Sequence, residues 1–125
     1  MSGKMVVRLK NTIITSIEDT ETKKLKLIKM VDKEDGASIE LELPKALSDI
    51  FELKETVSIQ IDSEPISKGE DARLYAEGTV FKTKHEDDME VVGTLGGLRL
   101  VLVLDDPKPS QIKTFESQKI YISIT

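Results

Sequence analysis

The seven residues from Ala37 to Leu43, with the sequence ASIELEL, decide the fold class. Their large aliphatic side chains alternate with serine and glutamate. Because successive side chains of a β-strand point to opposite faces, this alternation predicts a strand with one buried and one solvated face. The same period of two recurs in residues 57–62 and 120–125, which we expect to form two further strands.

More strands are predicted on both sides of this one. Residues 5–17 and 23–31 carry alternating apolar residues, and a change of parity near Leu27 and Ile28 predicts a β-bulge or strong coiling in the second segment. The pair Asp35-Gly36 predicts a tight hairpin turn. Three more strands are expected, separated by polar or glycine-rich turns, at residues 72–84, 89–95 and 97–104.

Residues Pro44 to Phe51 interrupt the strand pattern. Proline suits the first turn of a helix, and Leu47, Ile50 and Phe51 recur at three- and four-residue spacing. This spacing predicts a short helix, since residues three and four apart lie on one face. It is the one helix that the sequence predicts.

About eight short strands at close spacing, one short helix and no linker predict a single all-β domain over residues 1–125. We expect a closed eight-stranded antiparallel barrel of the oligonucleotide/oligosaccharide-binding-like type, because that barrel also carries a helix between its third and fourth long strands. A β-sandwich is the alternative, since two packed sheets produce the same alternation.

Composition excludes several classes of function. The 125 residues include no cysteine, which rules out a disulfide framework, a thiolate zinc site, an iron–sulfur cluster and a cysteine nucleophile. The net charge of −5 argues against a protein whose main task is coating nucleic acid, because phosphate binding needs a basic surface. No apolar run approaches the ~18 residues that span a bilayer, and no signal peptide is visible, so we expect a cytoplasmic protein.

The polar motifs predict no catalytic, metal or cofactor site. His85, the single histidine, lies in the acidic segment 84–88, where a solvated turn residue is a better interpretation than a general base or metal ligand. The paired acidic residues between strands lack the ligand spacing of a calcium loop. Gly93, Gly96 and Gly97 precede a strand, so a turn or bulge explains them better than phosphate binding.

Two aromatic residues carry the sharpest hint of nucleic-acid binding. Tyr75 and Phe81 share parity on one predicted strand, and aromatic side chains on one sheet face can stack the bases of single-stranded nucleic acid. Only Arg73, Lys82 and Lys84 accompany them as cations, and a barrel core also needs large side chains. Packing is therefore the favoured interpretation, and base stacking is the alternative.

The residues from Leu98 to Leu104 are apolar on both faces, with Arg99 as the exception. A strand of this kind is buried on both sides, either within the core or by the core and a partner. The sequence leaves open which parity faces outward. We expect a partner protein to contact this strand or an adjoining edge through Gly96, Gly97, Leu98, Arg99, Leu100 and Val101.

Three segments resemble a known family. They are Leu74 to Phe81 (LYAEGTVF), Leu95 to Leu100 (LGGLRL) and Lys119 to Ile122 (KIYI). Together they are similar to the small common subunit of eukaryotic nuclear RNA polymerases, the eighth in size order, and more closely to the archaeal counterpart of that subunit. The loop from Glu64 to Asp71 is shorter than the acidic loop of the eukaryotic form, which favours the archaeal one.

This resemblance implies a non-catalytic structural subunit of DNA-directed RNA polymerase. In the family, the barrel consists of two incomplete oligonucleotide-binding-like halves. It docks on the outside of the largest subunit, near the pore and funnel, where it helps assembly and stability. The resemblance implies no cofactor, and contact with nucleic acid is expected to be indirect or weak. A free-standing barrel that binds single-stranded nucleic acid is the alternative function.

Overall fold

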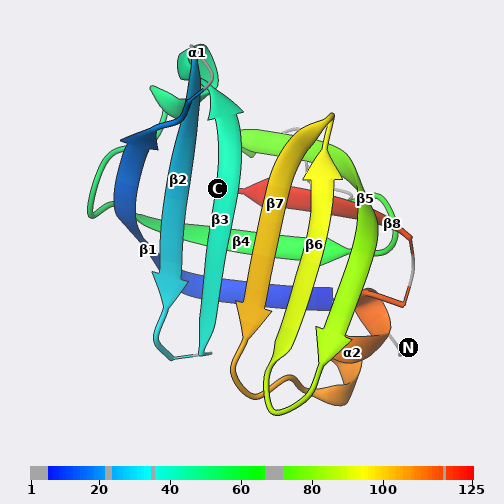
Figure 1. Cartoon of the computed structure of the whole chain (residues 1–125). Coiled ribbons are helices and arrows are strands. Elements are labelled where there is room, and N and C mark those ends of the chain that lie inside the picture. The colour runs from blue at the N-terminus through cyan, green and yellow to red at the C-terminus, as the bar shows by residue number, and fades with distance from the viewer. Residues whose placement is uncertain (1–5, 22–23, 35, 67–71, 117) are drawn as a thin grey trace.

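The computed structural model describes residues 6–21, 24–34, 36–66, 72–116 and 118–125. Its strands are β1 (Val6–Asp19), β2 (Leu25–Asp32), β3 (Ala37–Pro44), β4 (Thr56–Asp62), β5 (Leu74–His85), β6 (Met89–Leu95), β7 (Leu98–Leu104) and β8 (Lys119–Ile124). They close into one antiparallel barrel in the order β1-β2-β3-β7-β6-β5-β8-β4 and back to β1 (Figure 1). The predicted eight-stranded barrel is confirmed, and the sandwich alternative is wrong.

Two long strands bend and join the two sides of the barrel. β1 and β5, of 14 and 12 residues, run from the layer of β4 and β8 at the back of Figure 1 into the upright layer at the front. Register shifts lie between Ile14 and Ser16 in β1 and between Val80 and Lys82 in β5. Such irregularities increase local twist and allow one strand to serve two layers.

The bulge predicted near Leu27 and Ile28 is wrong. β2 pairs with β3 without interruption from Leu25 to Asp32. Ile28 and Met30 are buried in the core, whereas Leu27 is half-buried on the outer face. The change of parity therefore reflects apolar residues on both faces of β2, and the irregularity lies on the neighbouring strand β1. The expectations for Met5, Lys23, Asp35 and loop residues 67–71 fall outside the described part of the chain.

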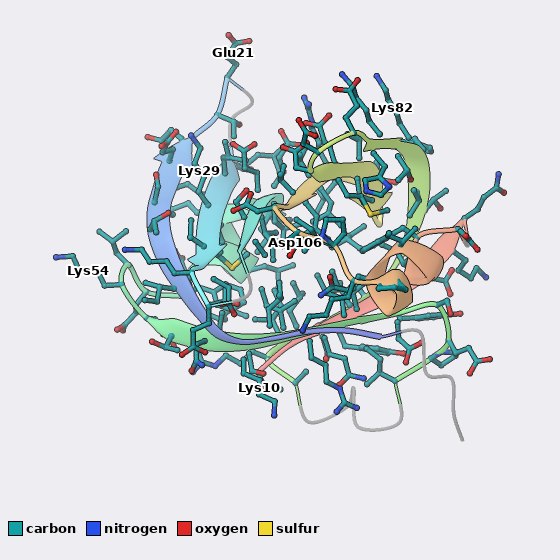
Figure 2. All side chains as sticks on the ribbon, turned by 90° about the horizontal axis from the view of Figure 1, so that it is seen from below. Lys10, Glu21, Lys29, Lys54, Lys82 and Asp106 are labelled. Carbon is teal, nitrogen blue, oxygen red and sulfur yellow. The ribbon has the colours of Figure 1, made fainter. Side chains whose placement is uncertain are left out.

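The inward positions of the strands form one hydrophobic core. Figure 2 shows side chains filling the interior of the barrel, whereas Lys10, Lys54 and Lys82 project outward. Burying each large aliphatic side chain contributes about 1.5–3 kcal/mol, so this core supplies the main stabilisation. The largest fully buried side chains are Leu9, Ile14, Ile28, Met30, Ile39, Leu41, Leu43, Ile59, Ile61, Met89, Leu100 and Leu102.

The predicted helix forms, but it is shorter than expected. α1 (Lys45–Ser48) follows β3 directly and begins after Pro44. Phe51, beyond its end, is buried at 5 % exposure. Leu47 and Ile50, expected on the same side as Phe51, are each 40 % exposed. A helix of four residues completes about one turn, so it cannot direct all three side chains into the core.

A second short helix, α2 (Pro109–Thr114), follows β7 and is not predicted by the sequence pattern. It packs against β1 at the end of the barrel opposite α1 (Figure 1). Ile112 packs partly against the core, and Phe115 just after the helix is 4 % exposed. Two apolar residues in so short a segment give too weak a period to indicate a helix.

Two glycines allow β5 and β6 to approach each other closely. A Cβ atom on Gly78 would lie 2.4 Å from the carbonyl oxygen of Thr94, and one on Gly93 would lie 2.4 Å from that of Thr79. Backbone atoms in paired strands cannot move aside as a flexible side chain can. Both positions therefore require glycine, and Gly78 belongs to one of the segments that carry the family resemblance.

We expect Gly93→Ala to destabilise the barrel by about 1–3 kcal/mol, because the added methyl group overlaps the β5 backbone. Urea unfolding measures this loss. Gly96→Asn is the control, because Gly96 has a φ of 58° that asparagine tolerates, and a Cβ there meets no atom within 4 Å. A loss at Gly93 no larger than the loss at Gly96 would contradict the close approach of the two strands.

Candidate docking surface

The residues predicted to contact a partner lie in different environments. Gly96 and Gly97 form the exposed turn between β6 and β7, with φ angles of 58° and 86°. Arg99 is on the outer face of β7, and Val101 shares that face but is only 9 % exposed. Leu98 packs partly against the core. Three of the six residues, Gly96, Gly97 and Arg99, are therefore exposed, and Leu98 is partly exposed.

Leu100 is wrongly assigned to the partner surface. Its side chain is fully buried, and its strand position pairs with Leu41 of β3 and Gly93 of β6. Because β7 is paired on both sides, its register fixes which parity enters the core. The sequence could not decide this point, since both parities of β7 are apolar.

We expect Leu100→Ala to lower the free energy of unfolding by about 2–5 kcal/mol, because it leaves a cavity in the core. Arg99→Ala should change stability by less than about 0.5 kcal/mol. The backbone N–H of Arg99, which hydrogen-bonds Glu42, survives this substitution. Chemical denaturation of both variants provides the measurement, and equal losses would contradict the assigned parity of β7.

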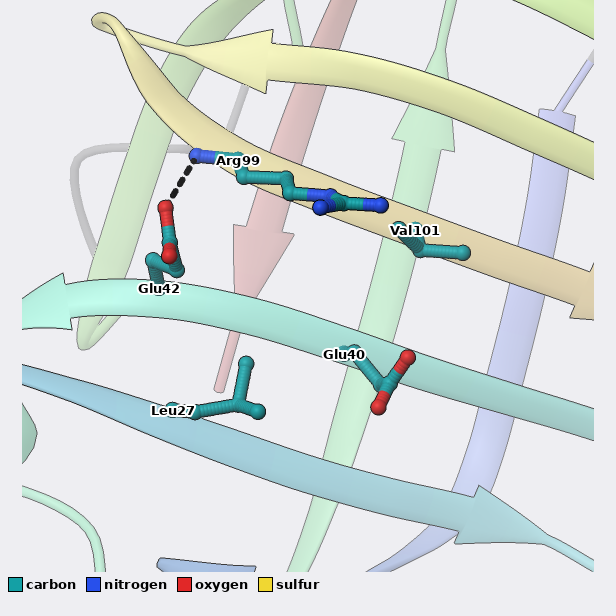
Figure 3. A pocket seen from close by; sticks show the side chains of 5 residues that line it. All are labelled: Leu27, Glu40, Glu42, Arg99 and Val101. Carbon is teal, nitrogen blue, oxygen red and sulfur yellow. Dashed lines mark hydrogen bonds between the residues drawn. The ribbon is translucent and has the colours of Figure 1, made fainter. Parts of the chain in front are cut away.

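A hollow of about 190 Å³ lies on the outer face of the barrel beside this strand (Figure 3). Leu27 of β2 and Val101 of β7 supply its apolar lining, while Glu40 and Glu42 of β3 and Arg99 of β7 supply charge. Sequence reasoning missed the β2 and β3 residues, because alternating glutamates in a strand indicate only a solvated face. The pairing of β3 with β7 brings them to Arg99.

The hollow forms where the β3–β7 ladder ends. The last paired residues are Leu41 and Leu100. One residue further, the backbone N–H of Arg99 donates to Oε1 of Glu42 at 3.2 Å, so a side-chain carboxylate accepts the bond that a strand carbonyl would otherwise accept. The guanidinium group of Arg99 extends along β7 toward Val101 (Figure 3). Among the described residues, no ion pair involves Arg99.

The β6–β7 turn with Gly96 and Gly97 lies at the same end of the barrel as α1 (Figure 1). Glu42 and Arg99 place the hollow close to that end, because they lie two residues before the end of β3 and one residue after the start of β7. β3 and β7 are antiparallel, so the end of β3 that leads into α1 lies beside the start of β7. The segments that meet here are far apart in the sequence. Strand pairing assembles them, and we refer to this region as the α1 end.

A compact turn follows α1 and fixes the chain before β4. Glu55 accepts a hydrogen bond from the backbone N–H of Glu52 at 3.0 Å and forms an ion pair with Arg73. The backbone N–H of Lys54 donates to the carbonyl of Ile14 at 2.7 Å, and Lys54 adopts a left-handed φ of 69°. The Glu52 hydrogen bond first, and then Arg73, lower the pKa of the Glu55 carboxyl.

We expect Arg73→Gln to raise the pKa of Glu55 toward its ordinary value, although the Glu52 hydrogen bond keeps part of the lowering. A lowered pKa means that the ionised carboxylate stabilises the turn above the ordinary glutamate pKa. This stabilisation is lost as the pH falls through the folded-state value. Carboxyl NMR titration measures the shift, with Arg8→Gln as the control. An unchanged Glu55 pKa in the Arg73 variant would contradict the ion pair.

Tyr75 and Phe81 do not form one base-stacking platform, and the favoured interpretation, packing in the core, is wrong because both side chains are exposed. Tyr75 is 38 % exposed and stacks on Tyr121, with ring centroids 6.3 Å apart and an interplanar angle of 16°. Its hydroxyl accepts the backbone N–H of Ile66 at 3.0 Å. Phe81 is 68 % exposed at the β5 register shift, and six residues of strand place it about 20 Å from Tyr75. Tyr121, which the sequence reasoning missed, is therefore the aromatic partner of Tyr75.

The remaining polar groups are placed as follows. His85 is the exposed last residue of β5. Within the described residues, no group of three or more histidine or carboxylate side chains could hold a metal ion. In the same part of the chain, no helix is long and apolar enough to cross a membrane. A comparison with models of known protein families gives no match, and neither does a search of curated proteins.

Proposed function

We propose that this protein is a non-catalytic structural subunit of an archaeal DNA-directed RNA polymerase. In this role it docks on the largest subunit and supports the assembly and stability of the transcribing enzyme in the cytoplasm. The observation that carries the proposal is the placement of the three family-like segments. They lie on β5, on the β6–β7 turn with the start of β7, and on β8, which are neighbours in the order β7-β6-β5-β8.

The architecture supports the same proposal. α1 lies between the third and fourth strands, as in barrels of the oligonucleotide/oligosaccharide-binding-like type, and we assign the barrel to that type. Gly78, in the first family-like segment, occupies a place where the β6 backbone leaves no room for a side chain. The second segment contains the double-glycine turn at the α1 end.

The hollow beside β7 has the properties of a protein-docking site. Its apolar lining, Leu27 and Val101, is bordered by charged side chains, as in protein interfaces with an apolar centre and a polar rim. Arginine is enriched among residues that dominate binding energy, and Arg99 has its guanidinium group directed over this hollow. We therefore assign Arg99 and Val101 to the contact with the largest subunit.

The nucleic-acid alternative has less support. Tyr75 and Phe81 are too far apart for adjacent bases, and one face of Tyr75 is occupied by Tyr121. The net charge of −5 also opposes phosphate binding. Nucleic acid is then contacted weakly or indirectly, through the larger subunits.

Co-expression with the largest subunit from the same genome tests the proposal. The tagged chain should retain the largest subunit through gentle washing. Arg99→Glu should weaken binding at least about tenfold, because it places a third carboxylate beside Glu40 and Glu42. Lys10→Glu, an equal charge reversal on β1, is the matched control and should bind as the wild type does.

Failure of the wild-type chain to bind the largest subunit would contradict the proposed function. Binding to a labelled single-stranded oligonucleotide that weakens with salt and with Tyr75→Ala would instead favour the nucleic-acid alternative. Equal binding by Arg99→Glu and the wild type would remove the hollow from the interface.

A further inference from the structure

Three large aliphatic side chains at the α1 end are left outside the core. Leu47 and Ile50 are each 40 % exposed, and Leu53 is 55 % exposed. They follow one another at intervals of three residues, from α1 into the turn after it. Phe51, between them, fills the core. Of the four large apolar residues of this segment, the barrel therefore buries Phe51 and leaves three exposed, which we call the aliphatic trio.

The trio is carried by a fixed backbone. The N–H of Ile50 donates to the carbonyl of Leu47 at 3.3 Å, and that of Phe51 donates to Ser48 at 3.0 Å. After Leu53, the backbone N–H of Lys54 donates to the carbonyl of Ile14 on β1, and the Glu55 carboxylate accepts the backbone N–H of Glu52. A surface ordered before binding loses less conformational entropy when a partner covers it. The trio thus has the rigidity that suits a binding anchor.

The charges around the trio point to the kind of partner. Lys45 and Lys54 are balanced by Asp49 and Glu52, so the surrounding segment has no net charge. Phosphate groups of nucleic acid or of anionic lipids require a basic surface. A segment without net charge that carries three exposed aliphatic side chains matches an apolar patch on another protein, since interface centres are depleted of charge.

We propose that the aliphatic trio is an apolar anchor that inserts into an apolar depression on the same protein that covers the hollow beside β7. This inference rests on the proposed function, which makes that protein the largest polymerase subunit. α1, in which the trio begins, lies at the same end of the barrel as the strand ends that line the hollow (Figure 1). One partner that covers that end can therefore contact both. The two contacts differ in chemistry, since the hollow is partly charged and the trio is apolar.

Binding of the full chain to the purified largest subunit tests the anchor. Leu53→Asp should weaken binding by about 30-fold or more, because a carboxylate would be buried in an apolar depression. The combined Leu47→Asp, Ile50→Asp and Leu53→Asp variant should abolish detectable binding. Phe81→Asp is the control, since Phe81 is more exposed, at 68 %, and lies on β5. It should bind within about threefold of the wild type, the range of a contact outside the interface.

Each other outcome overturns the inference in a recognisable way. Wild-type binding that Leu53→Asp leaves unchanged would remove the anchor and leave the proposed function intact. If the wild-type chain does not bind the largest subunit, both the anchor and the proposed function are contradicted. Equal losses with Leu53→Asp and Phe81→Asp would show a non-specific effect. A dimer of the isolated chain that Leu53→Asp dissociates would assign the trio to self-association. Circular dichroism and thermal unfolding check that each variant is folded. If the triple variant is unfolded, the binding of the folded Leu53→Asp variant alone tests the anchor.

Discussion

Closure of the barrel is the constraint on which the rest of the structure depends. Each strand must pair on both sides, so no strand can shift by one residue without turning its apolar side chains out of the core. Eight strands close only because β1 and β5 bend between the two layers. In this closed barrel the backbones of β5 and β6 approach closely, and Gly78 and Gly93 allow this approach because they carry no Cβ atom. Core composition, strand curvature and glycine placement are therefore consequences of one requirement.

Closure also limits how another molecule can bind. Closure leaves only short strand segments paired on one side, such as residues 16–19 of β1 and 82–85 of β5, so a partner has little edge through which to extend the sheet. Outer faces, turns and helices offer the larger surface for binding. At the α1 end the β3–β7 ladder stops, Glu42 accepts the Arg99 N–H, and a hollow opens between these strands. At this end the β3–β7 ladder stops, and the aliphatic trio is exposed in the segment that follows β3. Both features lie where regular strand pairing ends.

The sequence predicts the strands well and the candidate docking surface only in part. Alternation identifies a strand whenever one of its faces is polar, and β3 is an example. It fails for β7, where Leu100 and Val101 are both apolar and only pairing with β3 and β6 decides which one is buried. Spacing also misleads at Leu47, because a four-residue helix has no second turn to cover that side chain. Glu42 gives no sequence signal at all, since its role depends on a residue 57 positions further along the chain.

The net charge of −5 is unevenly distributed over the barrel. The register Ala37–Leu104 and Leu104–Met89 places the turns after β2, β5 and β7 together at the end opposite α1. Those turns carry exposed acidic groups, including Glu34, residues 86–88 and residues 105–106. Phosphate is repelled from that end, whereas the segment 45–54 at the α1 end carries no net charge and suits contact with protein. A barrel docked through its α1 end would direct its acidic turns away from the partner. In the proposed role, this distribution would keep the acidic end away from the partner and leave nucleic acid to the other subunits.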